Sequence, residues 1–283
     1  MLGHKLVERL RGRFECWGTV RSRAADYAHF GIVDPTRLLE AVDATNFETV
    51  LAAVGRVRPD VVVNCVGILK QLPAAKDPIA TLQVNALFPQ RLALLCEAAG
   101  AWLVHISTDC VFSGRKGDYS EADIPDAEDL YGRTKLLGEP GGASTLVLRT
   151  SMIGRELHSR VGLVEWLVGC RGQRVKGYRK ARFSGLTTTA IAELAGDLIA
   201  RRERLTGLFH LGTDGIDKYD LLCRLNEALR LGATVEVDDS VAIDRTLNSD
   251  RFWQRAGLSR PRWPDMIDAM ATEAATYDQW RRK

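Results

Sequence analysis

The sequence predicts an α/β protein with a doubly wound parallel sheet and a smaller α/β part toward the C-terminus. Short apolar runs of strand type alternate with helical segments, which is the pattern of βαβ units. The runs at 61–67, 102–107 and 145–150 are largely apolar, as is typical of parallel strands that are covered on both faces. Each run ends in small or polar residues, at the edge where ligands bind in such sheets.

Length and composition limit the functional classes. The 283 residues, 46% of them hydrophobic and 27% charged, suffice for one large or two modest domains. A net charge of +3 is too small to indicate nucleic-acid binding. No apolar run reaches the roughly 18 residues of a membrane span. The six cysteines lack a C-x-x-C pair and the five histidines lack ligand spacing, so we expect reduced thiols in a cytoplasmic protein and no metal site.

The first 23 residues predict a helix at 1–12, a strand at 13–20 and then a basic turn. This order is that of a Rossmann-like, dinucleotide-binding fold without its first strand. In the complete unit, a strand and a glycine-rich turn precede a helix whose N-terminus holds the pyrophosphate. Gly3 would be the last glycine of that turn. Two interpretations stay open: a plain surface helix, or a natural protein that is longer by one strand and one loop.

The basic turn after the second strand indicates the cofactor. An acidic residue there binds the ribose hydroxyl of NAD, whereas an arginine accommodates the phosphate of NADP. Arg21 and Arg23 stand at this place, and no acid occurs before Asp26. NADPH is therefore the expected cofactor, NADH is left open, and a solvated basic turn is the alternative. Farther on, Asp43 is a candidate for contact with the adenine.

The middle of the chain predicts a wall for the cofactor. A helix at 47–57 precedes the 61–67 strand, whose last residues lie where ligands bind. The following loop, 68–78, is long enough to reach over a site. The helix expected at 79–99 contains Pro89, which predicts a kink or a division into two helices.

The chemistry is expected between the 102–107 strand and the helix after it. The strand ends at Ser107 and Thr108, and the helix carries Tyr131 and Lys135. Side chains four residues apart lie on one helix face, about 5–6 Å apart at Cβ. We expect the Lys135 ammonium to lower the pKa of the Tyr131 phenol, which would make it a usable proton donor. For the pair alone, a solvated helix face is the alternative.

The pattern becomes less regular after residue 155. The expected helices are 161–170, 190–204, 218–231, 249–257 and 265–280, with strands at 207–211 and 233–238. The basic run 173–182 has two interpretations, a solvated mobile loop or a clamp for substrate phosphates.

Together these motifs resemble the extended short-chain dehydrogenase/reductase family, in the branch typified by dTDP-4-dehydrorhamnose reductase, apparently without its first strand. The residues that carry the resemblance are Val63-Asn64-Cys65-Val66-Gly67, Asn85-Ala86, Ser107-Thr108-Asp109-Cys110-Val111-Phe112, Tyr131-Gly-Arg-Thr-Lys135 with Gly138-Glu139, and Leu148-Arg149-Thr150-Ser151. The motifs are specific from about residue 60 to 155 and looser beyond. The resemblance implies an NAD(P)-binding domain at 1–153 and a mainly substrate-binding part at 154–283, interleaved with the first.

The resemblance also implies a catalytic set of Thr108, Tyr131 and Lys135. Tyr131 would protonate a carbonyl oxygen, Thr108 would hydrogen-bond to it, and Lys135 would hold the nicotinamide ribose. The implied reaction is NAD(P)H-dependent reduction of a 4-keto nucleotide sugar, in deoxysugar or polysaccharide biosynthesis. The expected cofactor-binding residues are Gly3, Arg21, Asp43, Ala44, Asn64, Cys65, Val66, Gly67, Asn85, Tyr131 and Lys135. The expected substrate-binding residues are Thr108, Asp109, Cys110, Arg182, Thr187 and Arg245.

Alternative functions remain. A nucleotide-sugar epimerase or dehydratase of the same superfamily is one, although a dehydratase usually has an acid pair where this chain has Asp109 followed by Cys110. Relatives often carry an aromatic residue at the Cys110 position. A non-catalytic binding protein is another alternative, because the regulatory subunit of methionine adenosyltransferase resembles the same branch. A homodimer is left open.

Overall fold

Four parallel strands form the central sheet of the computed structural model, which describes residues 1–201 and 203–281. Their order is β10-β5-β4-β3, and every neighbouring pair is parallel. The strands are β3 (Val61–Asn64), β4 (Trp102–Ile106), β5 (Thr145–Arg149) and β10 (Gly207–His210). All five residues of β4 and of β5 are buried, as the apolar runs predicted.

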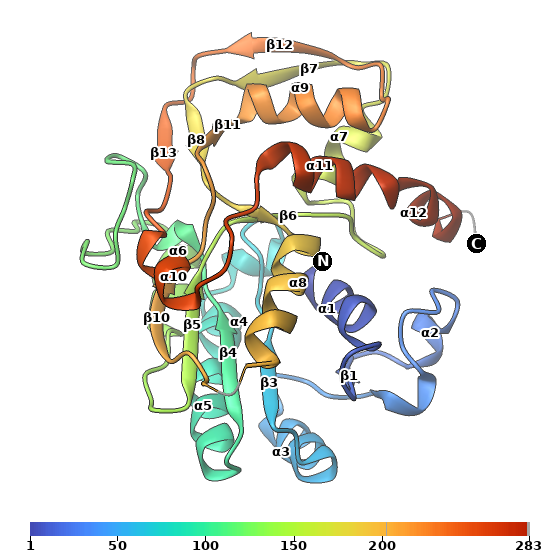
Figure 1. Ribbon diagram of the computed structural model, residues 1–283, viewed down its shortest axis with the longest axis vertical. Coiled ribbons are helices and arrows are strands. Elements are labelled where there is room, and N and C mark those ends of the chain that lie inside the picture. Colours follow the sequence, from blue (N-terminus) through green and yellow to red (C-terminus); the bar gives the residue numbers. More distant parts are fainter. Residues whose placement is uncertain (202, 282–283) are drawn as a thin grey trace.

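Helices cover both faces of this sheet, which confirms the doubly wound α/β class (Figure 1). On one face, α1 (Leu2–Leu10) and α8 (Thr188–Ile199) pack over Val104 and Ile106. On the other, α3 (Phe47–Val57) and α5 (Phe88–Ala98) pack over Leu103. The alternation follows from the two-residue period of a strand, whose successive side chains point to opposite faces.

A second parallel pair, β1 (Gly18–Thr19) and β2 (Leu38–Leu39), stands apart from the central sheet. Among the described residues, neither β3 nor β1 has a second strand beside it. In a Rossmann-like sheet, the first strand lies between the strands that correspond to β1 and β3. The arrangement therefore agrees with the prediction of such a fold without its first strand. The expected strand at 13–20 is thereby reduced to two paired residues. The short helix α2 (Ala25–Ala28) connects this pair.

The helix expected at 79–99 is divided, as its proline predicted. It consists of α4 (Pro78–Thr81), a π-helical turn (Leu82–Leu87) and α5. Pro89 has no N–H to donate to the Asn85 carbonyl one turn earlier, so the helix cannot continue regularly there.

Smaller sheets form the C-terminal part, at the top of Figure 1. Their strands are β6 (Met152–Ile153), β7 (Arg174–Tyr178), β8 (Ala181–Phe183), β9 (Leu186–Thr187), β11 (Ile216–Asp217), β12 (Thr234–Asp238) and β13 (Ile243–Arg245). The helices are α7 (Leu163–Gly169), α9 (Lys218–Ala228), α10 (Asp250–Ala256), α11 (Trp263–Thr272) and α12 (Ala274–Trp280).

The basic run 173–182 corrects one interpretation, because it is not a loop but strand β7 and the start of β8. Val175 and Gly177 are buried, while Arg174 and Lys176 alternate with them and are exposed, so the charges of β7 lie on the solvated face of the strand.

The chain beyond residue 153 also contributes to the central layers. Strand β10 pairs with β5, and α8 packs against α1. The C-terminal end reaches α1 as well: the Lys5 ammonium, 1% exposed, lies 2.6 Å from Glu8 and 2.8 Å from Glu273. His4 and Tyr277 share a hydrogen bond of 2.7 Å.

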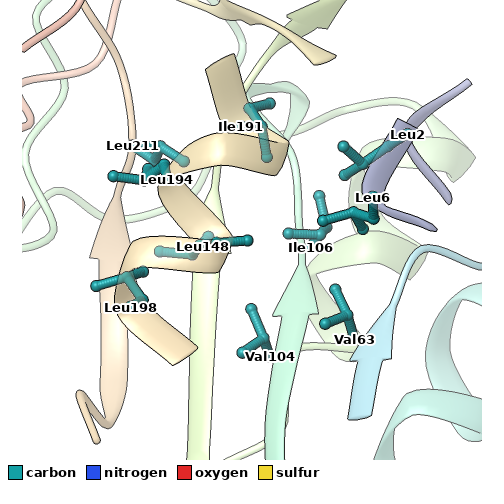
Figure 2. Close-up of a pocket in the computed structure, with 11 residues that line it drawn as sticks. Leu2, Leu6, Val63, Val104, Ile106, Leu148, Ile191, Leu194, Leu198 and Leu211 are labelled. Carbon is teal, nitrogen blue, oxygen red and sulfur yellow. The ribbon is translucent and has the colours of Figure 1, made fainter. Parts of the chain in front are cut away.

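An apolar cavity lies between α8 and the central sheet (Figure 2). Its wall is aliphatic, with Leu6, Val63, Val104 and Ile191 pointing into it. Its volume of about 10 Å³ is at the lower limit for one water molecule, and it offers no polar side chain. It is a packing defect of the core, and the chemistry lies elsewhere.

Candidate active site

The end of β4 supplies the first catalytic candidate. Thr108 is buried, and its Oγ1 accepts a hydrogen bond from the Cys110 backbone N–H at 3.1 Å. This bond starts a short 3-10 turn, Asp109–Val111, which ends the strand sharply. The same hydroxyl lies 3.3 Å from an Asp109 carboxylate oxygen, to which it donates. Thr108 is therefore held in one orientation by its own loop.

Helix α6 (Leu130–Leu137) brings Tyr131 to this strand end. The Asp129 carboxylate caps the helix by accepting from the Gly132 N–H at 2.8 Å. It also pairs with Lys70 at 2.7 Å, which ties the loop after β3 to the start of the helix. Gly132 permits the close approach, because a Cβ there would overlap the Cys110 carbonyl oxygen.

This packing gives a testable expectation for Gly132→Ala. The added methyl group must push α6 away from Cys110, which costs about 1–3 kcal/mol of stability. A shift of about 1 Å at Tyr131 would lower turnover by about 10²-fold. Denaturant unfolding and steady-state kinetics measure both effects. The matched control is Gly55→Ala in α3, where a Cβ meets no atom within 4 Å. A Gly132→Ala protein as stable and as active as the wild type would contradict this expectation.

The electrostatic environment of Tyr131 differs from the sequence expectation. Burial raises the pKa of its phenol above the ordinary value, and the neighbouring Cys110 raises it further. The Thr108 hydroxyl opposes this rise by hydrogen bonding. The expected lowering by Lys135 is thus wrong for this structure, because desolvation of the phenolate dominates. At neutral pH the phenol keeps its proton, which is the form that a proton donor requires.

Lys135 lies one helical turn farther and is 4% exposed. Its Nζ donates to the Ile106 carbonyl oxygen at 2.9 Å, at the end of β4. Burial lowers the pKa of Lys135 to about 8, while Glu139 and Cys65 act to raise it. Since this value lies above 7, most of the molecules carry the ammonium at neutral pH.

A buried ion pair lies just after the end of α6, four residues beyond Lys135. Glu139 accepts two hydrogen bonds from Arg149, at 2.8 Å from Nε and 2.7 Å from Nη2. It also accepts from Ser107 Oγ at 2.6 Å. Gly138 makes room for this arrangement, because a Cβ there would overlap the Asn85 carbonyl oxygen. Two neighbouring strands and α6 therefore meet at one carboxylate.

The predicted cofactor wall after β3 is a loop pinned by two amides. Asn64 Nδ2 donates to His105 Nδ1 at 3.0 Å, and its Oδ1 accepts from the Val66 N–H at 3.0 Å. Asn85 Oδ1 accepts from the Ile68 N–H at 2.8 Å, and Asn85 Nδ2 donates to the Ile68 carbonyl at 3.0 Å. Both asparagines are buried and act through the loop rather than at its surface.

Three residues of this loop, between the contacts of Asn64 and Asn85, are accessible to a ligand. Cys65 and Val66 are exposed, and Gly67 is partly exposed. The first turn of α1 lies against this wall, since a Cβ on Gly3 would be 3.8 Å from that of Cys65. The end of β1 supplies exposed Arg21, and Asp43 follows β2 with Ala44 beside it. The hydrogen bonds from Thr45 lower the pKa of the Asp43 carboxyl. The charge of Arg21 lowers that pKa further by a smaller amount.

Asp109 and Cys110 follow Thr108 in the 3-10 turn. Asp109 is 6% exposed, and burial raises the pKa of its carboxyl while Arg245 and Lys218 oppose that rise. Burial also raises the pKa of the Cys110 thiol to about 12, so the thiol is neutral. Arg245 reaches the loop after β4, where its Nε donates to the Phe112 carbonyl at 2.9 Å.

Two predicted substrate residues lie apart from this cluster. Arg182 is 52% exposed, and its guanidinium is 3.8 Å from Asp244. It borders a polar hollow of about 400 Å³ that also touches Arg260. Thr187 is buried, and its hydroxyl caps α8 by accepting from the Ala190 N–H at 3.2 Å. Lys218 was missed by sequence reasoning, because no motif surrounds it.

No group of three or more His, Cys, Asp or Glu side chains in residues 1–201 and 203–281 is placed to hold a metal ion. Within the same ranges, no helix has the length and apolar character needed to span a bilayer.

The chain is similar to known proteins over most of its length. The family model described as the RmlD substrate binding domain matches residues 1–245. The dTDP-4-dehydrorhamnose reductase of Shigella flexneri is 26% identical over 258 residues, which cover 83% of this chain and 86% of that protein. The mouse methionine adenosyltransferase 2 subunit beta is 28% identical over 262 residues, covering 81% and 77%.

A solved structure shows the same fold. The dTDP-4-dehydrorhamnose reductase of Bacillus anthracis, crystallised in complex with NADP, superimposes with a TM-score of 0.73. The match covers 90% of this chain and 97% of that one, at 20% identity. The family expected from the motifs and the Rossmann-like α/β fold are both confirmed.

Proposed function

The chain belongs to the family of the RmlD substrate binding domain, and from this we propose that it is an NAD(P)H-dependent reductase of a 4-keto nucleotide sugar. The observation that carries the proposal is the convergence of Thr108, Tyr131 and Lys135 at the end of β4. The reductases among its relatives support the substrate class. The proposal places the chain in carbohydrate biosynthesis, as a cytoplasmic oxidoreductase.

The chemistry assigns one role to each side chain. The protonated Tyr131 phenol gives its proton to the carbonyl oxygen of the substrate as that oxygen gains negative charge. The Thr108 hydroxyl donates a hydrogen bond to the same oxygen. The Lys135 ammonium lies one helical turn from the phenol, where its charge favours the phenolate left after proton transfer.

The residues present fit the cofactor that the family implies. NADPH supplies a hydride when it is bound. The exposed Cys65 and Val66, with Gly67, form a surface beside the first turn of α1, where backbone N–H groups attract phosphate. Arg21 would meet the additional phosphate of NADPH, and Asp43 the adenine. Lys135 would hold the nicotinamide ribose. NADH remains the alternative cofactor.

The decisive experiment is NADPH oxidation with a panel of 4-keto sugar nucleotides, dTDP-4-dehydrorhamnose among them. Consumption of NADPH with at least one substrate, together with formation of the 4-hydroxy sugar, would support the proposal. No consumption with any member, by a protein that is shown to be folded and to bind NADPH, would reject it.

The cofactor preference yields a separate prediction. Arg21→Glu should raise KM for NADPH about tenfold, which corresponds to roughly 1.4 kcal/mol of lost binding. KM for NADH should change little or fall, because a carboxylate suits a free ribose hydroxyl. Arg56→Glu is the control, since Arg56 is exposed near the end of α3. Equal changes for both cofactors would show that Arg21 does not contact the distinguishing phosphate.

A second candidate function is a non-catalytic binding role. The similarity to the mouse regulatory subunit favours it over other non-enzymatic functions. The intact catalytic set favours the reductase. Turnover of a sugar nucleotide that is lost in Tyr131→Phe would decide for the enzyme.

A further inference from the structure

A lysine remote in sequence faces the catalytic strand end. Lys218 is the first residue of α9 and follows strand β11 directly. Its Nζ lies 3.7 Å from the centroid of the Phe183 ring. In the part of the chain that the structure describes, it has no ion pair with a carboxylate within 4.0 Å. The face of the ring attracts the ammonium and holds it in place without neutralising its charge, which leaves that charge available to a ligand.

The small sheet β11-β8-β13 explains where Lys218 points. Phe183 of β8 lies opposite Ile216 of β11 and Arg245 of β13, so these side chains share one face. Lys218 follows Ile216 by two residues and joins that face, as its contact with Phe183 shows. Arg182 lies opposite Asp217 and Asp244, on the reverse face. The sheet therefore presents Lys218 and Arg245 together.

This face meets the loop that carries the catalytic threonine. Arg245 donates to the Phe112 carbonyl, and the Asp244 N–H donates to the Gly114 carbonyl at 2.7 Å. Asp109 interacts electrostatically with both cations and accepts a hydrogen bond from the Thr108 hydroxyl at 3.3 Å. Burial lowers the pKa of Lys218, while Asp109 raises it. Arg245 also interacts with Asp129, which itself pairs with Lys70 at 2.7 Å. Lys218, which forms no ion pair among the described residues, is therefore the cation left for a ligand.

We propose that Lys218, with Arg245 beside it, binds an anionic group of the substrate close to the end of β4. The inference rests on the proposed function for the nucleotide-sugar class of that substrate. Two groups have this chemistry: a carboxylate on the sugar ring and the diphosphate. An ammonium and a guanidinium suit either one through charge-assisted hydrogen bonds.

The test measures binding by calorimetry without cofactor and without turnover, so that a failed reductase assay would not affect it. The probes are UDP, dTDP, UDP-glucose, dTDP-glucose and UDP-glucuronate. The proteins are the full chain, Lys218→Met, Lys218→Arg and the control Lys180→Met. Lys180 is exposed in the turn between β7 and β8, and its side chain forms no hydrogen bond with another described residue.

The pattern of losses identifies the anionic group. A loss of about tenfold or more in Lys218→Met for UDP-glucuronate alone would assign the sugar carboxylate. An equal loss for the free nucleoside diphosphates would assign the diphosphate. In both cases Lys218→Arg should restore part of the affinity, and Lys180→Met should bind as the wild type does.

The opposite result is as clear. If Lys218 serves only to balance the charge of Asp109, Lys218→Met would lower the stability to denaturant and leave every affinity within twofold. That outcome would overturn the proposal, as would a wild-type protein that binds none of the five probes.

Discussion

Replacing Tyr131 by phenylalanine is expected to reduce NADPH-dependent turnover by about 10²- to 10⁴-fold, the usual contribution of a positioned proton donor. The phenol is the group that the raised pKa keeps protonated at neutral pH beside Thr108. Phenylalanine preserves the ring and its packing on α6 but has no proton to give. Steady-state kinetics should show the loss in kcat, with KM for NADPH changed little.

The control for this substitution is Tyr178→Phe. Tyr178 lies in β7, is 36% exposed and belongs to the smaller sheets away from Thr108. It should leave kcat within twofold. If Tyr131→Phe retained more than a tenth of the wild-type rate, another group would have to donate the proton, and the proposed mechanism would be rejected.

Replacing Arg149 by methionine is expected to lower the free energy of unfolding by about 3–5 kcal/mol, because it leaves the Glu139 carboxylate buried without its partner. The two side chains are 4% and 9% exposed, and Arg149 donates to this carboxylate from both Nε and Nη2. Denaturant unfolding measures the loss. The change should also weaken the anchoring of α6 on β5, and with it the position of Lys135.

The double variant Glu139→Gln with Arg149→Met distinguishes pairing from bulk packing. It removes the uncompensated charge, so it should regain a large part of the lost stability. The control for charge removal alone is Arg174→Met, whose side chain is 81% exposed and whose loss should cost less than about 1 kcal/mol. Additive losses in the double variant would show that the two side chains do not act as a pair.

The candidate catalytic set could be named from the sequence, because Tyr131 and Lys135 share one helix face and Thr108 stands at a strand end. That Thr108 and Tyr131 meet depends on the close packing of α6 against Cys110. The division of the 79–99 helix was equally predictable, since a missing N–H at Pro89 acts on its own turn. Helix α3 was predicted with the bounds that the structure shows.

The electrostatics could not be predicted in the same way. The sequence spacing predicts that Lys135 lowers the Tyr131 pKa, but burial reverses the direction. Desolvation depends on every atom packed around the phenol, including those of Cys110 on another element. The sequence also does not show that the amides of Asn64 and Asn85 are used within the loop after β3.

The sequence by itself determined the α/β class, the strand ends and the candidate catalytic residues, because repeating apolar patterns and short motifs act over a few residues. Only the tertiary structure decided which charges reach Thr108. Arg182 and Arg245 lie on opposite faces of one small sheet, and Lys218 joins Arg245 from the start of α9. Strand register sets these positions, and register is fixed by packing between segments that are far apart in the chain.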